Sequence, residues 1–208
     1  MSQKQVFSIR TLAEIAIVAA LAMALSLIPL QVMWFEISLG TLLIALISLR
    51  HGTLIGIITG LIWGLLHFVL GKVYFLSVPQ VLIEYVLAFS FAGFAGLARQ
   101  PFIKTGKDRF IVLAIVLGAL AKYFWHFVAG VIFWSDYAWK GWGAVSYSLI
   151  INGVSCLLTL IVGSIILLVI RKAAPKLFKV LIKNEKCEDS HFFDIFDLFD
   201  IIITLVYF

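Results

Sequence analysis

Residues 143–170 have the sequence GAVSYSLIINGVSCLLTLIVGSIILLVI, a run of 28 residues without a single Asp, Glu, Lys or Arg. A helix rises about 1.5 Å per residue, so this run is longer than the roughly 20 residues needed to cross the hydrocarbon core of a bilayer. The apolar residues are continuous rather than alternating, which disfavours a membrane β-strand, and a helix satisfies its own backbone in lipid. The stretch therefore predicts a membrane-spanning helix.

The rest of the chain has the same character. Of its 208 residues, 63% are hydrophobic and 13% are charged, whereas soluble domains have roughly 45–50% and about 25%. Too little charge remains to give a globular protein of this size a wettable surface, which excludes a soluble enzyme and a disordered chain. We expect an all-α integral membrane protein with six transmembrane helices. The predicted spans are Thr11–Leu30, Ile37–Leu49, Thr53–Leu70, Leu76–Ala98, Phe110–Trp134 and Gly143–Ile170.

Lys and Arg gather on one side of these spans, and the positive-inside rule assigns that side to the cytoplasm. Six spans then place both termini in the cytoplasm. The net charge of +5 is explained by this topology and needs no nucleic-acid partner. The basic side holds Lys4, Arg10, Arg50, Arg99, Lys104, Lys107, Arg109, Arg171, Lys172, Lys176, Lys179, Lys183 and Lys186, and the other side holds only Lys72 and Lys140.

The chain divides into a membrane domain over residues 1–183 and a cytoplasmic or interfacial tail over residues 184–208. The tail is rich in Phe, with Asp194, Asp197 and Asp200 at every third position, and we assign it no role. Cys156 in an apolar run and Cys187 in the tail form neither a disulfide framework nor a metal motif. Phosphate-binding loops, HExxH and GxSxG are also absent from the sequence. We therefore predict no enzyme, no metal and no cofactor.

One face of the fifth predicted span is polar. Lys122, His126, Gly130 and Trp134 recur every four residues and share a helix face. Ionisable side chains inside a membrane are costly and usually face a cavity or a partner. A Lys and a His on one stripe therefore favour a binding cavity, and a structural polar contact between helices is the alternative.

Other spans are expected to present polar groups at the depth of His126. Counted from the outer helix ends, His126, Glu84, Trp63 and Asn152 lie seven to nine residues inward, which is roughly 10–14 Å along a helix. A buried carboxylate among indoles suits a flat, cationic, nitrogen-rich ligand. Glu84 can balance a positive ring or accept a hydrogen bond from an exocyclic amine, and Trp34, Trp63 and Trp134 can stack on the ring. Asn152 and Tyr147 can supply orienting hydrogen bonds. For each Trp taken alone, an interfacial anchor is the alternative.

Small residues at a spacing of four indicate close helix contacts. Ala16, Ala20 and Ala24 form such a strip on the first span. The strip is either internal packing or a docking face for another protein. The second set is Gly52, Gly56, Gly60 and Gly64, in the third span and its entry.

Taken together, several stretches resemble the thiamine-specific substrate-binding subunits (S-components, ThiT-like) of energy-coupling factor (ECF) vitamin transporters. The resemblance covers about residues 7–183. It is carried by the alanine strip, Trp34, GLIWGLLHFVLGKVYFLS at 60–77, IEY at 83–85, KYFWHFVAGVIFW at 122–134 and YSLIIN at 147–152.

This resemblance implies a six-helix subunit of a bacterial cell membrane that binds thiamine with high affinity near the extracellular side. The loaded subunit would dock through the alanine strip on a transmembrane coupling subunit, joined by two cytoplasmic ATPase subunits, and tip over to release its ligand inside. Trp134 would stack on the aminopyrimidine, Trp34 and His126 would flank the thiazolium, and Glu84 would be the negative partner. The implied ligand-binding residues are Trp34, Trp63, Tyr74, Glu84, Tyr85, Lys122, His126, Gly130, Trp134, Tyr147 and Asn152.

Two alternatives stay open on the sequence. One is an S-component for another vitamin such as riboflavin, although Glu84 opposite several indoles favours a cationic ring over a neutral one. The other is a self-sufficient secondary transporter or an intramembrane enzyme. The sequence lacks the inverted repeat and paired broken helices of many secondary transporters, and it lacks a nucleophile–base set.

Overall fold

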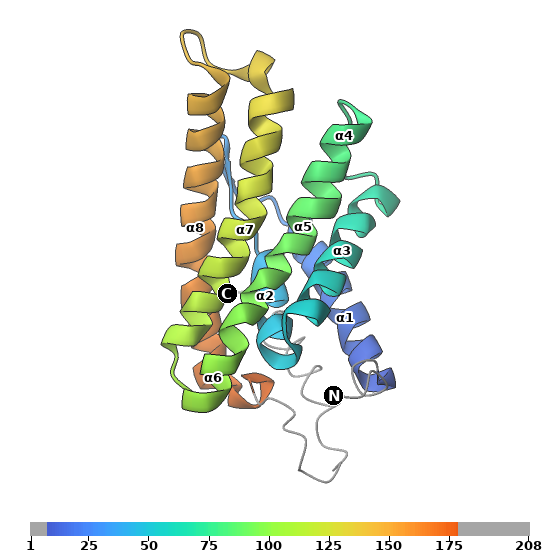
Figure 1. Ribbon diagram of the computed structural model, residues 1–208, viewed down its shortest axis with the longest axis vertical. Coiled ribbons are helices and arrows are strands. Elements are labelled where there is room, and N and C mark those ends of the chain that lie inside the picture. Colours follow the sequence, from blue (N-terminus) through green and yellow to red (C-terminus); the bar gives the residue numbers. More distant parts are fainter. Residues whose placement is uncertain (1–7, 179–208) are drawn as a thin grey trace.

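The computed structural model describes residues 8–178, and the predicted tail over residues 184–208 lies outside the described residues. Within this range four long helical segments and two shorter ones form a bundle (Figure 1). The 70–77 and 134–143 connections lie at one end, here called the upper end, and the 106–108 connection lies at the lower end (Figure 1). The segments are α1 (Ile9–Ser26), α2 (Gly40–His51), α3 (Thr53–Val69), a composite helix (Val78–Thr105), α7 (Arg109–Phe133) and α8 (Ala144–Ala173).

The helices follow the predicted spans in order but not at every boundary. Four of them, namely α1, the composite helix, α7 and α8, are long and apolar enough to cross a membrane, and α2 and α3 are shorter apolar helices. α1 ends at Ser26 rather than at the predicted Leu30, because Pro29 disfavours helical backbone in the residue before it. The fourth helix continues past the predicted end at Ala98 and stops where Gly106 adopts a left-handed conformation (φ +62°).

The composite helix is irregular along its length. It begins as α4 (Val78–Val81), widens into a π-helical turn η2 (Leu82–Leu87) and returns to α-helix in α5 (Ala88–Phe91). It then tightens into a 3₁₀ segment and ends in a regular helix, η3 (Ala92–Ala98) and α6 (Arg99–Thr105). Glu84 lies in the π-helical turn, a feature that is frequent at functional sites.

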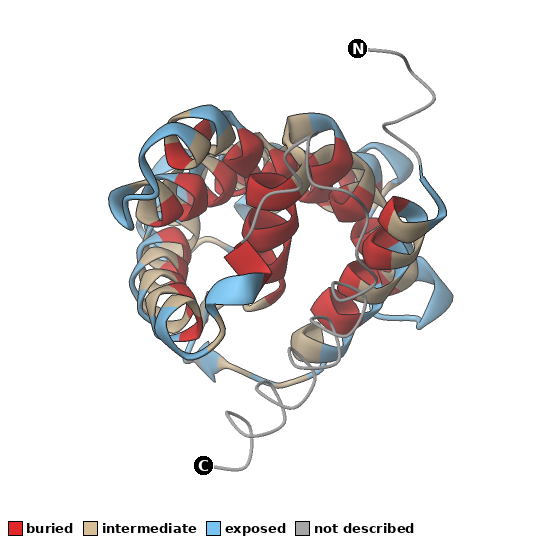
Figure 2. Ribbon diagram, turned by 90° about the horizontal axis from the view of Figure 1, so that it is seen from below, coloured by how far each residue is buried: buried red, intermediate tan, exposed pale blue. Residues whose placement is uncertain are grey.

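The shortest apolar helix lies innermost. Every residue of α2 from Gly40 to Arg50 is buried, and α2 contacts α1, α3, η3 and α7. Figure 2 shows buried residues gathered inside the ring of helices and exposed residues on its outside. A helix that is apolar all round is expected to be buried rather than to face solvent on one side. The apolar composition of α2 on all sides therefore reflects its internal position.

The glycine ladder of α3 is a contact inside the subunit. A Cβ atom at Gly60 would overlap the carbonyl oxygen of Phe89, and one at Gly56 would lie 2.9 Å from the Cα of Gly93. The ladder therefore lets the backbones of α3 and the composite helix approach closely, as small residues do in membrane bundles. It is not available for a partner protein.

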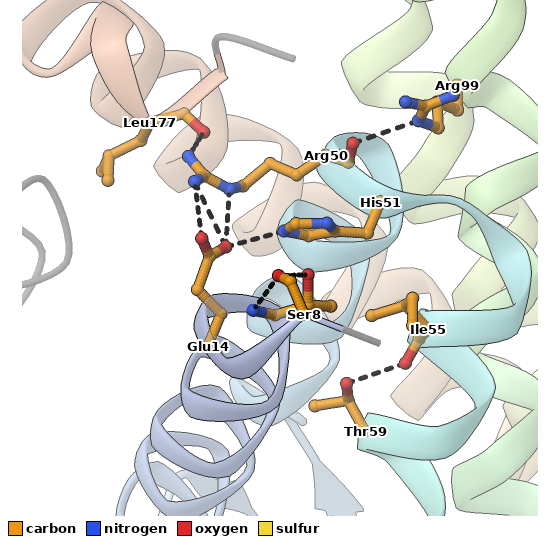
Figure 3. Close-up of polar contacts among 9 residues, drawn as sticks. Ser8, Glu14, Arg50, His51, Ile55, Thr59, Arg99 and Leu177 are labelled. Atoms are coloured by element: carbon orange, nitrogen blue, oxygen red, sulfur yellow. Dashed lines mark hydrogen bonds and ion pairs between the residues drawn. The ribbon is translucent and has the colours of Figure 1, made fainter. Parts of the chain in front are cut away.

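A buried ionic cluster holds the lower end together (Figure 3). The Glu14 carboxylate on α1 accepts hydrogen bonds from Arg50 Nε (3.2 Å) and Nη2 (3.3 Å) and contacts His51 Nε2 at 2.7 Å. Arg50 Nη1 also donates to the carbonyl oxygen of Leu177 (2.8 Å), and Arg99 Nε donates to that of Arg50 (3.0 Å). The cluster thus ties α1 and the segment after α8 to the end of α2.

The segment between α1 and α2 is extended. It contains a two-stranded antiparallel hairpin, β1 (Gln31–Val32) and β2 (Phe35–Glu36), in which Met33 has a positive φ of 58°. Side chains of α7 and α8 satisfy its backbone. Ser155 Oγ accepts from the Glu36 N–H (3.1 Å), Thr159 Oγ1 accepts from the Ser38 N–H (3.0 Å), and Tyr123 Oη donates to the Glu36 carbonyl (3.2 Å). Unpaired backbone groups are costly at membrane depth, so these bonds stabilise the insertion of the hairpin.

Candidate functional site

The centre of the candidate site is a buried carboxylate at the upper end of the bundle. Glu84 is 8% exposed. Its Oε1 accepts a hydrogen bond from Trp134 Nε1 at the end of α7 (2.7 Å), and its Oε2 accepts one from Gln80 Nε2. The composite helix and α7 are therefore joined through this side chain. In a low-dielectric setting such charge-assisted bonds are stronger than neutral ones.

Tyr74, in the 70–77 connection, lies beside the Trp134 ring that bonds to this carboxylate. The Tyr74 ring lies 5.0 Å from the Trp134 ring, centroid to centroid, and the Tyr74 N–H donates to Tyr85 Oη (3.0 Å). Tyr74 and Tyr137 share a hydrogen bond between their hydroxyls (3.1 Å), and this bond raises the pKa of the Tyr137 hydroxyl. The connection is thus fixed to both helices that meet at Glu84.

A second layer of polar and aromatic groups lies around Phe89. Lys122 Nζ is 4.9 Å from the centre of the Phe89 ring and donates to Ser38 Oγ (2.7 Å). The rings of Trp63 and His126 lie 4.4 Å and 6.1 Å from Phe89, edge to face. Cation–π contacts of this kind stabilise an ammonium group that has left water.

The predicted polar face of α7 is turned inward. Lys122 and Gly130 are buried, and His126 and Trp134 are partly buried. Leu120, Phe124 and Ile132, on the same helix, are 53–56% exposed. The spacing of four residues therefore identified the correct face.

The predicted common depth differs from the structure. Glu84 meets Trp134, which is eight residues and about 12 Å along α7 from His126. On the composite helix it is Phe89, five residues after Glu84, that packs against His126. Glu84 and His126, predicted at one depth, therefore lie in two different layers. The reason is that the composite helix begins at Val78 and includes a π-helical turn.

Trp63 belongs to the wall rather than to the surface of the site. It is 1% exposed, and its Nε1 donates to Ser26 Oγ (3.0 Å). A Cβ atom at Gly40 would overlap its ring. In this structure its faces are covered by protein, so it supports Phe89 and Lys122 instead of offering a stacking surface.

The other predicted residues come from three different elements. A Cβ at Gly130 would overlap Ser148 Oγ, and Asn152 Nδ2 donates to that same hydroxyl (3.1 Å), so Gly130 permits close contact between α7 and α8. Trp34 is 63% exposed at the tip of the hairpin, and the Tyr147 ring packs against Trp139 (5.4 Å). Within residues 8–178, neither of these two makes a hydrogen bond or ring contact with the other predicted residues.

The site includes side chains that the sequence patterns did not single out. These are Gln80 on Glu84, Ser38 on Lys122, Phe89 between the layers, Tyr137 on Tyr74 and Ser148 beside Gly130. Gln80 carries a sequence signal, since it is a polar residue four positions before Glu84 at the start of an apolar helix. Phe89 carries none, because it is one of 18 Phe residues in the chain.

The arrangement is suited to binding rather than to chemistry. It offers one carboxylate, several aromatic faces and orienting hydroxyl and amide groups, which together match a flat ring that carries positive charge. Among residues 8–178 there is no group of three or more His, Cys, Asp or Glu side chains that could hold a metal ion.

Comparison with known proteins decides the family. A family model described as "Thiamine transporter protein" matches residues 12–179. This chain belongs to that thiamine transporter family. The ThiT-like resemblance seen in the sequence is thereby confirmed, and the family's role is transport rather than catalysis.

Named members of the thiamine transporter family align over most of the chain. The thiamine transporter ThiT of Lacticaseibacillus paracasei is 37% identical over 177 residues, which cover 79% of this chain and 88% of that protein. ThiT of Bacillus subtilis is 31% identical over 179 residues, covering 81% and 93%. A solved structure of ThiT from Listeria monocytogenes superposes with a TM-score of 0.75 at 44% identity, covering 81% of this chain and 96% of that one.

Proposed function

We propose that this chain is the thiamine-binding membrane subunit of an ATP-driven ECF vitamin importer in a bacterial cell membrane. The observation that carries the proposal is the pairing of the buried Glu84 carboxylate with the Trp134 indole beside Tyr74. Thiamine joins an aminopyrimidine to a cationic thiazolium, so it needs a negative partner and aromatic faces. Membership of the thiamine transporter family supports the same ligand.

The ligand-binding residues have distinct roles in this proposal. Trp134 stacks on the aminopyrimidine, and Glu84 supplies the negative charge. Trp34 and His126 flank the thiazolium, with Trp34 acting as a lid from the hairpin tip, where its exposure leaves it free to close. The remaining members line or support the site: Trp63, Tyr74, Tyr85, Lys122, Gly130, Tyr147 and Asn152.

In this proposal, the subunit docks on the coupling and ATPase subunits through the outer face of α1, away from the ligand site. Six spans with both termini in the cytoplasm place the lower, basic end inside the cell. The docking strip for the transmembrane coupling subunit consists of Ala16, Ala20 and Ala24. Two cytoplasmic ATPase subunits complete the transporter complex. Thiamine enters from the extracellular side and is released inside after docking. The exposure of all three alanines on α1 supports this role.

Thiamine is expected to quench the intrinsic tryptophan fluorescence of the purified protein, because stacking on Trp134 or Trp34 places the cationic ligand against an indole. A titration in detergent at micromolar thiamine measures the effect. Riboflavin, the ligand of the alternative S-component, serves as the comparison. Fluorescence that does not change with thiamine would contradict the proposed function. A response to riboflavin alone would show that the vitamin bound is riboflavin and not thiamine.

Replacing Trp34 by Ala is expected to raise the dissociation rate of thiamine more than it lowers the association rate. Most interface substitutions act on dissociation, and a lid acts there most directly. Stopped-flow quenching of the remaining Trp residues measures both rates. Trp142→Ala is the matched control, since Trp142 is also exposed in an upper connection (45%) but is not in the predicted site. An effect confined to the association rate would contradict the lid.

A further inference from the structure

Gln80 has a buried side chain whose amide bonds in three directions. It is 0% exposed and lies four residues before Glu84, so the two side chains share one helix face. Its Nε2 donates to the Tyr74 carbonyl oxygen (3.1 Å) and to Glu84 Oε2, and its Oε1 accepts from the Leu76 N–H (3.0 Å). Both amide donors and the amide acceptor are therefore in use.

Helix capping explains only part of this arrangement. Ser77-Val78-Pro79-Gln80 has the S-x-x-Q form of a capping box, and Ser77 Oγ accepts from the Gln80 N–H (3.3 Å). The side-chain oxygen Oε1 of Gln80 accepts a hydrogen bond from the N–H of Leu76, one residue before the cap. Glu and Gln both serve at the N3 position of such a box, but only the amide of Gln can donate to an ionised carboxylate. The cap therefore does not account for the bond to Glu84.

The Glu84 carboxylate needs orientation as well as burial. The last torsion of a Glu side chain has a broad, twofold profile, so a single hydrogen bond leaves its plane loosely fixed. In this site Trp134 binds one oxygen and Gln80 binds the other. Two bonds on different oxygens fix the plane, and the remaining lone pairs then point in defined directions.

We propose that Gln80 is the positioning residue for Glu84, and that it couples the orientation of this carboxylate to the 70–77 connection that carries Tyr74. Gln80 does not contact the ligand in this proposal, and it acts on specificity through Glu84. Because its Nε2 donates to both Glu84 and the Tyr74 carbonyl oxygen, Gln80 positions the Glu84 carboxylate and the backbone of Tyr74 together. The effect on thiamine binding rests on the proposed function, whereas the effect on the carboxylate does not.

The first experiment needs no ligand and follows the indole N–H resonance of Trp134 in the purified full-length chain by NMR, assigned with Trp134→Phe. Gln80→Met removes all three hydrogen bonds of the side-chain amide. Gln80→Glu is a nearly isosteric second variant that lacks the amide N–H donors. Both are expected to shift the resonance, because the acceptor of Trp134 loses its fixed plane. Ser77→Ala is the matched control: it removes the cap bond to Gln80 and leaves the amide on Glu84, so the resonance should stay in place.

The second experiment measures selectivity by calorimetry with thiamine and two analogues. One analogue has an oxygen in place of the exocyclic amine, and the other has an uncharged ring in place of the thiazolium. In Gln80→Met, the preference for thiamine over one of these two analogues, whichever lacks the group that Glu84 binds, is expected to fall at least tenfold. A general loss of stability would instead weaken the binding of all three ligands alike. Ser77→Ala should keep the wild-type ratios.

The outcomes separate the inference from the proposed function. Failure of the wild-type protein to bind thiamine would contradict the function, and the Trp134 resonance would still test Gln80. An unchanged resonance in both Gln80 variants would overturn the inference, as would unchanged selectivity in Gln80→Met of a protein that binds thiamine. An equal shift in Ser77→Ala would assign the effect to the helix cap and would also overturn it.

Discussion

Glu84→Gln is expected to weaken thiamine binding by at least about 2 kcal/mol, or roughly 30-fold in Kd. Removing one member of a buried charge pair leaves the other charge uncompensated, which is why such changes cost several kcal/mol. The substitution also turns an acceptor-only carboxylate into an amide whose NH₂ group faces a donor, either Trp134 Nε1 or Gln80 Nε2. Calorimetry on the purified variant gives the dissociation constant directly.

Asp108→Asn is the matched control for this change. It removes the same charge from an exposed side chain at the start of α7, at the lower end of the bundle and away from Glu84. We expect less than a threefold change in its dissociation constant, since exposed charges are screened by water and salt. A Glu84→Gln protein that binds thiamine with unchanged affinity would assign Glu84 a structural role only.

The helices could be predicted from the sequence because apolar runs report directly on burial in lipid or protein. The predicted spans for α3 and α7 begin and end within one residue of the structure. Boundaries failed where a single residue overrides hydropathy. Pro29 ends the helical backbone inside an apolar run, and the helix predicted to end at Ala98 continues through the charged Arg99 to Thr105, before the left-handed Gly106. Hydropathy carries no information on either event.

The composition of the site was predictable to a greater extent than its contacts. A carboxylate, a Lys and a His in apolar helices stand out against their surroundings, and the structure brings all three inside the bundle. Which groups touch depends on the rotation and offset of neighbouring helices. A π-helical turn that contains Glu84 changes both, so Trp134 rather than His126 became its partner. Local spacing cannot reveal such a turn.

The same limit applies to tryptophan. Trp63 and Trp134 both lie in apolar stretches, and the local sequence does not distinguish between them. In the structure Trp63 packs over Gly40 and is bonded to Ser26, whereas Trp134 lies at the end of α7 against Glu84. The difference comes from contacts between residues far apart in the chain, which a periodic pattern along one helix does not encode.

The rotation of α1 about its axis determines whether the alanine strip faces the core or the outside of the bundle. Ala16, Ala20 and Ala24 are exposed, whereas Ala19 and Ala22 are 0% exposed in the core. Glu14 fixes this rotation, because its buried carboxylate is held by Arg50 and His51 at the lower end of α2 (Figure 3). A cationic partner on a buried carboxylate is costly to separate, so α1 keeps the strip on the outside.

Ala20→Trp is expected to abolish thiamine uptake in cells and to preserve thiamine binding by the isolated subunit. Helices associate in lipid through close packing, so a bulky side chain in the strip keeps a partner helix at a distance while the site across the bundle is untouched. Uptake of labelled thiamine and calorimetry on the purified subunit measure the two effects. Leu157→Trp, on the exposed face of α8 (55%), is the control and should keep both activities. Joint loss of binding and uptake in Ala20→Trp would make the strip a packing surface, and retention of both would place the partner elsewhere.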